Sequence, residues 1–198
     1  MKKLLLILLC VPLIGIGQTA DDYSDKANDY YDNGEYQLAI DNYTQAIIIS
    51  PDDDYLYYLR AFPYEELKQY ENAIADYTMA ISLNPEDDEY YFARAVLYHD
   101  ILEKYEYAIL DYTKIIEITP DDALLYGSRA EAFLALEKYE EAISDFTKCI
   151  ILNPDDAYAY YNRGIAKEYS GLPYCSDYKR GCELGDEDCC EWYNNQCR

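Results

Sequence analysis

The chain of 198 residues carries 39 acidic and 16 basic side chains, which give it a formal net charge of −23 at pH 7. This charge argues against binding to nucleic acid or to anionic membrane surfaces, because both require clustered lysine and arginine. Hydrophobic residues make up 51% of the chain, and its 26 tyrosines supply much of the material for a core.

The first residues have the pattern of an export signal. Lys2 and Lys3 precede an apolar run over residues 4–17, which is shorter than the ~20 residues that span a bilayer but suits a signal peptide. We therefore predict a signal peptide at residues 1–17 and no membrane insertion after its cleavage. The exported protein would reside in the periplasm, at the cell surface or outside the cell, in an oxidising compartment.

Small residues place the cleavage site. Gly15 and Gly17 occupy the third and the first position before Gln18, so the mature chain is predicted to begin at Gln18. Cys10 raises the alternative of a lipoprotein, but Leu9 before it is larger than the residue usual there.

One stretch of the chain occurs four times. Tyr70–Pro85, with the sequence YENAIADYTMAISLNP, has counterparts at Tyr36–Pro51, Tyr105–Pro120 and Tyr139–Pro154. The closing prolines are 34, 35 and 34 residues apart. A period of about 34 residues indicates stacked helix-turn-helix units.

Small and aromatic residues within the stretch are spaced as on a helix. Ala73, Tyr77 and Ala80 are separated by four and three residues, so they share one helical face. Pro85 ends this helix because it has no N–H. Residues 57–64 show similar spacing and predict another helix earlier in the unit.

With the closing proline counted as position 32, the units share an aromatic residue at position 4, a small residue at 8, Ala at 20 and an aromatic residue at 24. This pattern resembles the tetratricopeptide repeat. The resemblance implies an all-α, right-handed superhelical solenoid of antiparallel helix pairs, with about five units and a capping helix. We place the array at residues 18–170, in units near 20–53, 54–87, 88–122, 123–156 and 157–170 onward.

Three features depart from the regular pattern. Pro63 falls in the middle of a first helix, where we expect a kink without a break. The third unit has one extra residue, which we place in the turn near 99–104. Ile115 replaces a small residue at position 27, so the packing around it should loosen.

Acidic residues mark every boundary between units. Calcium binding and helix capping both use carboxylates at such places, but no boundary has the alternating oxygen ligands of a calcium loop. We therefore expect these acids to cap the helix that follows. They are Asp52, Asp53, Asp54, Glu86, Asp87, Asp88, Asp121, Asp122, Asp155 and Asp156.

Arginine at position 7 and aspartate at position 23 occur together in units two to five and are absent together from unit one. We interpret them as charge pairs that bridge helices, either within a unit or to the next unit. A row of arginines that faces a ligand is the alternative. The residues are Arg60, Arg94, Arg129, Arg163, Asp76, Asp111, Asp145 and Asp177.

The resemblance also implies a binding groove, because positions 2, 5, 9 and 12 of the first helices line the concave face of tetratricopeptide arrays. Here that lining is aromatic and acidic, which suits a protein or peptide partner with apolar and basic residues. The predicted groove residues are Asn28, Tyr31, Tyr55, Tyr58, Phe62, Glu65, Glu89, Phe92, Val96, Leu124, Glu131, Tyr158 and Tyr161. Only Asn28 matches the clamp with which some family members hold acidic chaperone tails, so that activity is not implied.

Residues 171–198 are predicted to form a cysteine-rich helical hairpin that turns at Gly185. Facing residues of an antiparallel hairpin have nearly constant summed numbers, and two cysteine pairs meet this condition. The predicted disulfides are Cys182–Cys190 and Cys175–Cys197. The first also resembles the disulfide of Sel1-like repeats. Cys149 and Cys189 are left as free thiols.

No catalytic set can be assembled from the sequence, which has a single histidine, His99, no Gly-rich phosphate loop and no metal-ligand spacing. We expect no enzymatic activity, no cofactor and no metal site. The sequence predicts an exported module or scaffold for protein–protein interaction. The alternative is a Sel1-like protein of the cell envelope that binds peptidoglycan or a small ligand.

The export prediction can be checked by intact-mass measurement of protein from its native host. The expected mass is that of a chain beginning at Gln18. A mass that includes residues 1–17, or a lipid attached to Cys10, would contradict the prediction.

Overall fold

The computed structural model describes residues 18–198, so the predicted signal peptide lies outside the described residues. These residues form eleven α-helices and one π-helix, with no strand among them. The elements are α1 (Ala20–Asp32), α2 (Tyr36–Ile49), α3 (Asp54–Glu66), α4 (Tyr70–Leu83), α5 (Asp88–Val96), η1 (Leu97–Ile101), α6 (Tyr105–Ile118), α7 (Ala123–Ala135), α8 (Tyr139–Leu152), α9 (Ala157–Tyr169), α10 (Cys175–Glu183) and α11 (Glu187–Gln196).

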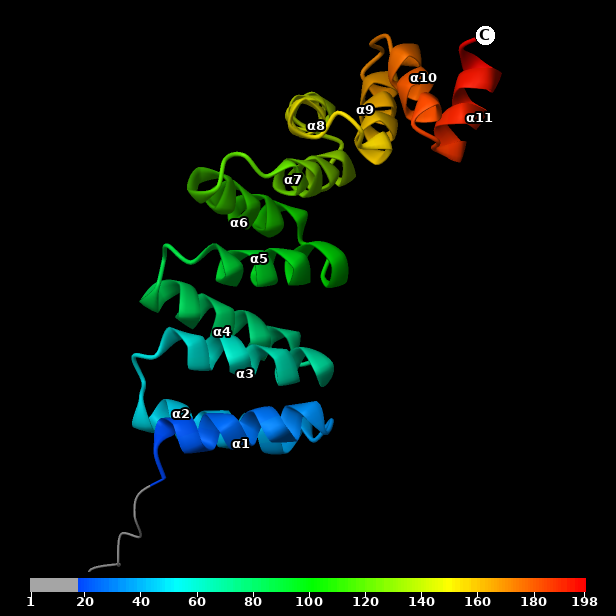
Figure 1. Cartoon of the computed structure of the whole chain (residues 1–198). Coiled ribbons are helices and arrows are strands. Elements are labelled where there is room, and N and C mark those ends of the chain that lie inside the picture. The colour runs from blue at the N-terminus through cyan, green and yellow to red at the C-terminus, as the bar shows by residue number, and fades with distance from the viewer. Residues whose placement is uncertain (1–17) are drawn as a thin grey trace, which may run out of the picture.

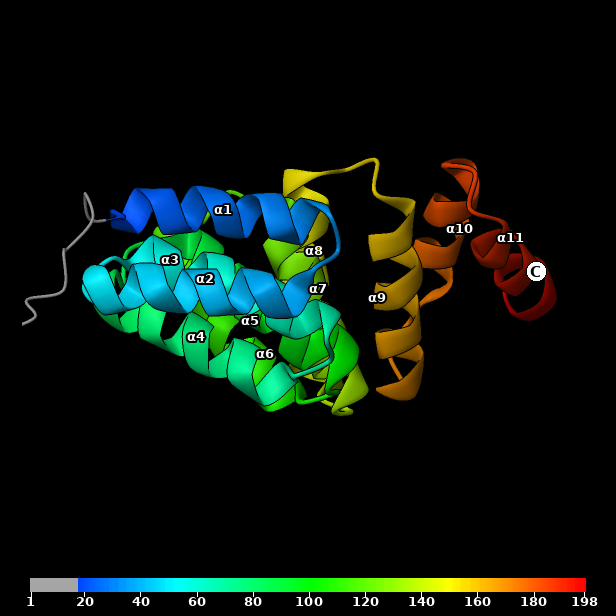
Figure 2. The ribbon, with the colours of Figure 1, turned by 90° about the horizontal axis from the view of Figure 1, so that it is seen from below.

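The helices stack in antiparallel pairs, each packed mainly against its neighbours in sequence (Figure 1). When the stack is seen from below, α9 crosses the direction of α1, so the pairs turn progressively along the array (Figure 2). The predicted all-α solenoid is confirmed. Because each unit packs mainly against the units beside it, local interfaces dominate the stability.

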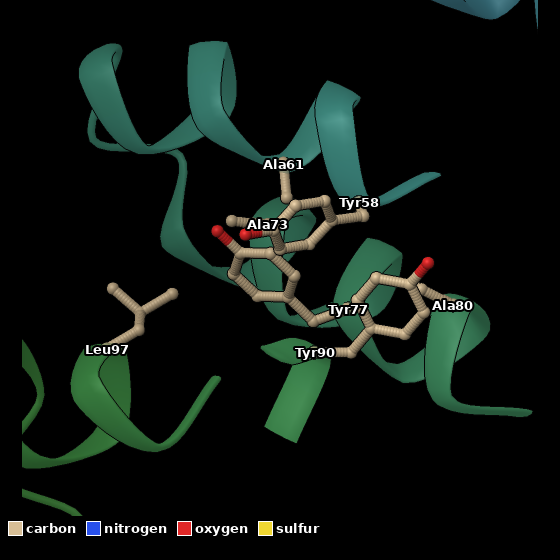
Figure 3. Close-up of a cluster of buried hydrophobic side chains, with 7 residues drawn as sticks. All are labelled: Tyr58, Ala61, Ala73, Tyr77, Ala80, Tyr90 and Leu97. Atoms are coloured by element: carbon tan, nitrogen blue, oxygen red, sulfur yellow. The ribbon is translucent and has the colours of Figure 1, made fainter. Parts of the chain in front are cut away.

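Alanines and tyrosines build the core between successive helices. Ala61, Ala73 and Ala80 are completely buried, and their small side chains bring the helices close around the buried ring of Tyr77 (Figure 3). Burial of such a ring stabilises the fold by about 1.5–3 kcal/mol. A larger residue at Ala73 would overpack this site, at a typical cost of about 1–3 kcal/mol.

One aspartate at each unit boundary caps the first helix that follows, which confirms the capping prediction for four of the ten boundary acids. Asp53 accepts the backbone N–H of Tyr55 at 3.1 Å, and Asp122 accepts that of Leu124 at 2.8 Å. Asp87 and Asp156 cap α5 and α9 in the same way. Each cap satisfies a backbone donor that has no partner within its helix.

A left-handed residue closes the turn inside each unit. Gly34 has φ of 76°, a conformation that glycine adopts without the clash of a Cβ. Lys68, Glu103 and Glu137 take φ values of 57°, 51° and 57° at the corresponding turns. The turn geometry is therefore kept even where the residue is unfavourable for it.

Two irregularities of the sequence have different outcomes. Helix α3 continues through Pro63, whose ring is buried, so there is no break. The extra residue of unit three is taken up by η1, where the N–H of Leu102 bonds to the carbonyl of Leu97 at 3.2 Å. The insertion therefore widens the end of the first helix as a π-bulge at Leu97–Ile101, which corrects the predicted longer turn.

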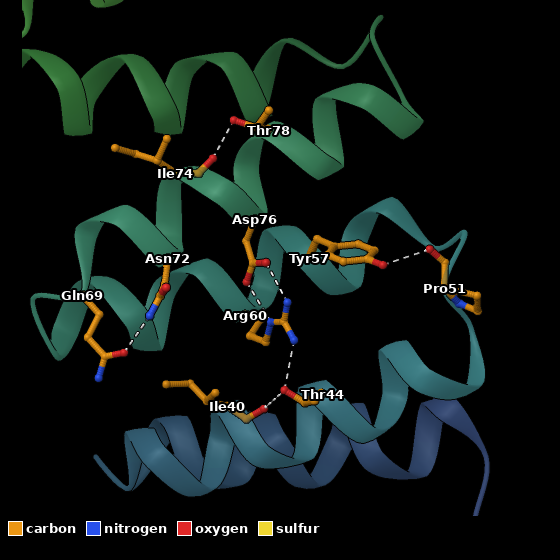
Figure 4. Close-up of polar contacts among 10 residues, drawn as sticks. All are labelled: Ile40, Thr44, Pro51, Tyr57, Arg60, Gln69, Asn72, Ile74, Asp76 and Thr78. Atoms are coloured by element: carbon orange, nitrogen blue, oxygen red, sulfur yellow. Dashed lines mark hydrogen bonds and ion pairs between the residues drawn. The ribbon is translucent and has the colours of Figure 1, made fainter.

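An arginine of each unit after the first joins three helices. Arg60 on α3 makes two parallel hydrogen bonds to Asp76 on α4, at 2.8 and 2.7 Å, and a third to Thr44 on α2 at 3.0 Å (Figure 4). Thr44 can accept because its own hydroxyl donates to the carbonyl of Ile40. Arg60 thus bridges its own unit and the preceding one.

The same contact recurs three times with similar geometry, which confirms the interpretation of these residues as pairs that bridge helices. The remaining sets are Arg94 with Asp111 and Thr78, Arg129 with Asp145 and Thr113, and Arg163 with Asp177 and Thr147. The aspartates are 2–7% exposed. Burial raises the pKa of Asp76 and of Asp111, and the arginine hydrogen bonds oppose that rise.

The chain ends in the hairpin of α10 and α11. The structure joins Cys175 to Cys197 and Cys182 to Cys190, with Cα–Cα distances of 5.6 and 4.5 Å, and leaves two buried free thiols. Cys189 is one of them and packs so closely on Gly181 that a Cβ there would lie 2.2 Å from its sulfur. Bridges of this kind typically contribute about 2–4 kcal/mol, which suits a hairpin with a small core.

We predict that Arg129→Ala destabilises the array by about 3 kcal/mol or more, because it leaves Asp145 buried without its partner. Thr113→Val should cost about 1 kcal/mol, since it removes only the acceptor in the preceding unit. Thermal unfolding followed by circular dichroism measures both effects.

Lys114→Ala is the matched control, because Lys114 forms an exposed pair with Glu117 at 3.5 Å that should contribute at most about 0.5 kcal/mol. If Arg129→Ala lowered the melting temperature no more than Lys114→Ala, the arginine contact would not be what joins the units.

Candidate functional site

The first helices α1, α3, α5, α7 and α9 present the predicted groove residues. All of these residues except Tyr58 are at least partly exposed. Tyr55, Leu124 and Tyr158 expose 52%, 62% and 55% of their surface, although each is large and carries an apolar body. The groove therefore offers apolar contact area that the fold itself does not use.

Tyr58 is a correction to the predicted lining. It is 9% exposed, and its ring lies 5.0 Å from that of Tyr90 and 4.9 Å from that of Phe62. The reason is that Tyr90, from the next unit, closes over it. Tyr58 thus belongs to the core beneath the first-helix surface, and burial and the nearby Glu89 raise its pKa above the ordinary tyrosine value.

Core tyrosines at position 24 extend their hydroxyl groups from the core to polar side chains of the first helices. Tyr43 donates to Asn28, Tyr77 donates to Glu65, and Tyr178 donates to Glu168. The sequence identified these tyrosines as packing residues but could not show where their hydroxyls end. Asn28 and Glu65 consequently have less hydrogen-bonding capacity left for a partner than their positions suggest.

Unit three has a histidine at the equivalent place. His99 Nδ1 lies 3.4 Å from the Tyr112 hydroxyl, and the imidazole meets the Tyr105 ring edge-on at 5.4 Å. Burial lowers the pKa of His99, which the neighbouring Asp100 partly offsets. This histidine packs against tyrosines and has no serine or cysteine nucleophile among these contacts.

Two groove carboxyls are held in partly buried positions. Burial raises the pKa of Glu65, and the hydrogen bond from Tyr77 opposes the rise. Burial also raises the pKa of Glu131, and the nearby Asp100 raises it further. A cationic group nearby would favour the ionised form of both carboxyls.

A hollow of about 440 Å³ lies between α5 and α7. Its lining combines apolar side chains with carboxylates and consists of Asp87, Asp88, Glu89, Phe92, Ile115, Thr119, Asp122, Leu124 and Leu125. Ile115 lines this pocket but is itself 2% exposed, within a core cluster that includes Tyr112 and Leu125.

A second hollow of about 70 Å³ lies in the next junction and includes Leu124, Glu131 and Tyr158. Cys149 forms part of its lining and is 2% exposed. Burial and the neighbouring Asp156 raise the pKa of this thiol to about 12, so it is protonated and unreactive at neutral pH.

Within residues 18–198, His, Cys, Asp and Glu form no group of three or more that could hold a metal ion. In the same part of the chain, every helix falls short of the length and apolarity that crossing a membrane requires.

The stacked helix pairs and their groove define a helical-repeat protein. Family models agree with this: one described as TPR repeat matches residues 27–67 and 64–101, and one described as Tetratricopeptide repeat matches residues 123–156. Together these matches cover more than half of the chain. The chain belongs to the tetratricopeptide repeat family.

Solved structures show the same fold. The structure titled "Crystal structure of MamA protein" is 19% identical, with a TM-score of 0.75 over 92% of this chain and 98% of that chain. YrrB, titled "a TPR protein with an unusual peptide-binding site", is 18% identical, with a TM-score of 0.75 over 89% and 92%. MamA from Desulfovibrio magneticus RS-1 is 17% identical, with a TM-score of 0.70 over 93% and 100%. No curated protein matches the sequence of the chain.

The raised pKa of Glu131 predicts a pH-dependent stability. A carboxyl whose pKa is higher in the folded chain stabilises the fold below its ordinary value of 4.5, and this contribution is lost as pH rises through the folded value. Glu131→Gln removes the charge, so it should raise the melting temperature at pH 7 and have a smaller effect near pH 4. An equal effect at both pH values would show that burial of the charge is not the cause.

Proposed function

We propose that the chain is an exported scaffold for protein–protein interaction that binds a partner segment in the groove of its first helices. The tetratricopeptide fold supports the general role, because such arrays present extended concave surfaces. Export rests on the pattern of residues 1–17, and the two disulfides suit an oxidising compartment.

The observation that carries the groove proposal is the row of exposed side chains on successive first helices. Tyr55, Leu124 and Tyr158 remain more than half exposed. Leu124 shares pocket linings with Glu89 and Glu131, and Tyr158 lies near Glu131. Aromatic and apolar residues that are rigid on a helix can serve as anchors at little cost in entropy. YrrB, with the same fold, is described as having a peptide-binding site.

Charge supports a basic partner. A net charge of −23 repels acidic surfaces and steers basic ones toward the groove, so association should slow as ionic strength rises. We therefore propose that the bound segment combines apolar anchors with lysine or arginine.

The test compares two triple variants of the exported, oxidised protein. The groove variant is Tyr55→Ser, Leu124→Ser and Tyr158→Ser. The control is Ile48→Ser, Leu110→Ser and Ile151→Ser, which changes residues of 67%, 66% and 67% exposure on second helices. Both should keep the helicity measured by circular dichroism.

The expected result is that immobilised wild-type and control proteins capture the same partner from an envelope extract, and that the groove variant loses it. Each anchor removed typically costs about 2 kcal/mol or more of binding free energy. Equal capture by the groove variant would contradict the groove. Retention of the protein only on purified peptidoglycan would favour the envelope-binding alternative.

A further inference from the structure

The pocket between α5 and α7 corresponds to a place that a tyrosine fills one unit earlier. At the junction of units two and three, Tyr90 stands at position 3 of α5 and is 3% exposed. Its ring packs on Tyr58, and Figure 3 shows it beside Ala80. The Tyr90 hydroxyl donates to Asp54 Oδ2 at 2.6 Å, and the amide of Asn84 donates to the same oxygen at 3.2 Å.

The next junction has the same backbone positions with different side chains. Leu125 stands where Tyr90 did, Phe92 replaces Tyr58, and Asp88 takes the place of Asp54. A leucine is shorter than a tyrosine and has no hydroxyl, so part of the space stays open as the pocket of about 440 Å³.

Asp88 also lacks the donors that its counterpart has. Thr119 occupies the place of Asn84, but its hydroxyl donates to the carbonyl of Ile115 at 3.1 Å. Among residues 18–198, no side chain donates a hydrogen bond to Asp88. The junction of units three and four therefore keeps an open space and a carboxylate acceptor. It lacks the aromatic ring and the hydroxyl that Tyr90 supplies at the junction of units two and three.

The other carboxylates of the pocket have different roles. Asp87 accepts the N–H of Glu89 at 3.1 Å and Asp122 accepts that of Leu124 at 2.8 Å, so both are engaged as helix caps. Glu89 is exposed at the rim. Among residues 18–198, Asp88 is thus the aspartate of this lining whose carboxylate accepts no hydrogen bond, and the rim charges favour basic residues beside a side chain inserted into the pocket.

We propose that this pocket receives a tyrosine side chain of the partner segment, with its ring against Phe92 and Leu125 and its hydroxyl donating to Asp88. The proposal rests on the proposed groove function and names the residue type that the groove recognises. The tyrosine is flanked by lysine or arginine in the partner.

A first experiment supplies the tyrosine from the chain itself. Leu125→Tyr should restore the arrangement of the preceding junction and raise the melting temperature relative to Leu125→Phe, which fills the space without a hydroxyl. This difference should vanish when Asp88→Ala is added to both variants. Equal melting temperatures of the Tyr and Phe variants would overturn the role of Asp88 as the acceptor.

A second experiment uses acetylated, amidated pentapeptides Gly-Lys-Xaa-Lys-Gly, with Tyr, Phe, Leu or Arg at the central place, titrated into the ¹⁵N-labelled exported protein. The Tyr peptide should shift the amide signals of Phe92 and Leu125 and bind up to about tenfold more tightly than the Phe peptide, the ratio that one hydrogen bond supplies. Asp88→Ala should remove this ratio, and Leu125→Tyr should abolish binding. Leu110→Ser, outside the groove, should change neither.

Equal affinity for all four peptides, or a preference for the Arg peptide, would overturn the assignment of the pocket to tyrosine. The groove proposal would still be tested separately by the partner-capture experiment. Tyr-selective binding that persists in Leu125→Tyr would place the site elsewhere and overturn the inference. Loss of capture by the groove variant together with failure of these peptides would refute the tyrosine pocket alone.

Discussion

Cohesion of the array depends on the contact among arginine, aspartate and threonine that recurs at every junction between units. Each arginine holds a buried aspartate of its own unit and reaches a threonine of the unit before, so one side chain fixes geometry within and between units. The guanidinium suits this task, because it has several donors in a rigid plane. The first unit has Lys26 and Asn42 in place of the pair. Unit one therefore lacks this contact among the described residues.

The far end of the array strengthens the same contact. Asp177 on the short helix α10 receives Arg163 at 2.7 Å and also Lys167 at 2.7 Å. Gly164 allows the Tyr178 ring to approach, because a Cβ there would lie 2.7 Å from the ring. Charge, ring packing and the two disulfides thus secure a helix pair too short to be held by apolar burial alone.

The contact also shapes the surface. The four arginines of this contact are turned inward, where their side chains are 14–16% exposed, whereas Arg180 and Arg198 of the terminal hairpin remain more exposed. The groove is left with carboxylates and tyrosines. The alternative interpretation of the pattern was a row of arginines that faces a ligand. Such a row would have produced a surface that favours acidic ligands.

Periodicity predicted the fold because the same spacing recurs in each unit and each recurrence strengthens the helix assignment. The pairing of arginine with aspartate followed for the same reason. The threonine of the contact was missed, although Thr44, Thr78, Thr113 and Thr147 share one position, because a helical threonine usually bonds only to its own backbone. The sequence also did not show that the inserted residue forms a π-bulge. A π-bulge and a longer turn both add one residue, so the spacing of the repeat positions cannot distinguish them.

Groove residues were harder to predict than the fold. The position of a residue in the repeat determines the direction in which its side chain points, but it does not determine whether a neighbouring unit covers that side chain. Tyr58 and Phe92 share position 5, yet Tyr58 is covered and Phe92 borders an open pocket. The difference comes from position 3 of the following unit, which is Tyr90 in one case and Leu125 in the other. Exposure at one unit is thus decided by a side chain of the next.

Because the units repeat, each junction between units can be compared with the others, and the junctions differ in how completely side chains fill them. The junction of units two and three is closed by Tyr90, whereas that of units three and four opens into about 440 Å³. The junction of units four and five narrows to about 70 Å³, although Gly127 and Ala159 occupy positions 5 and 3 there. The open pocket lies between two junctions that are filled more completely. It can therefore fix where an extended segment binds along the array, because a shift by one unit would place the segment's anchoring side chain at a junction with too little space for it.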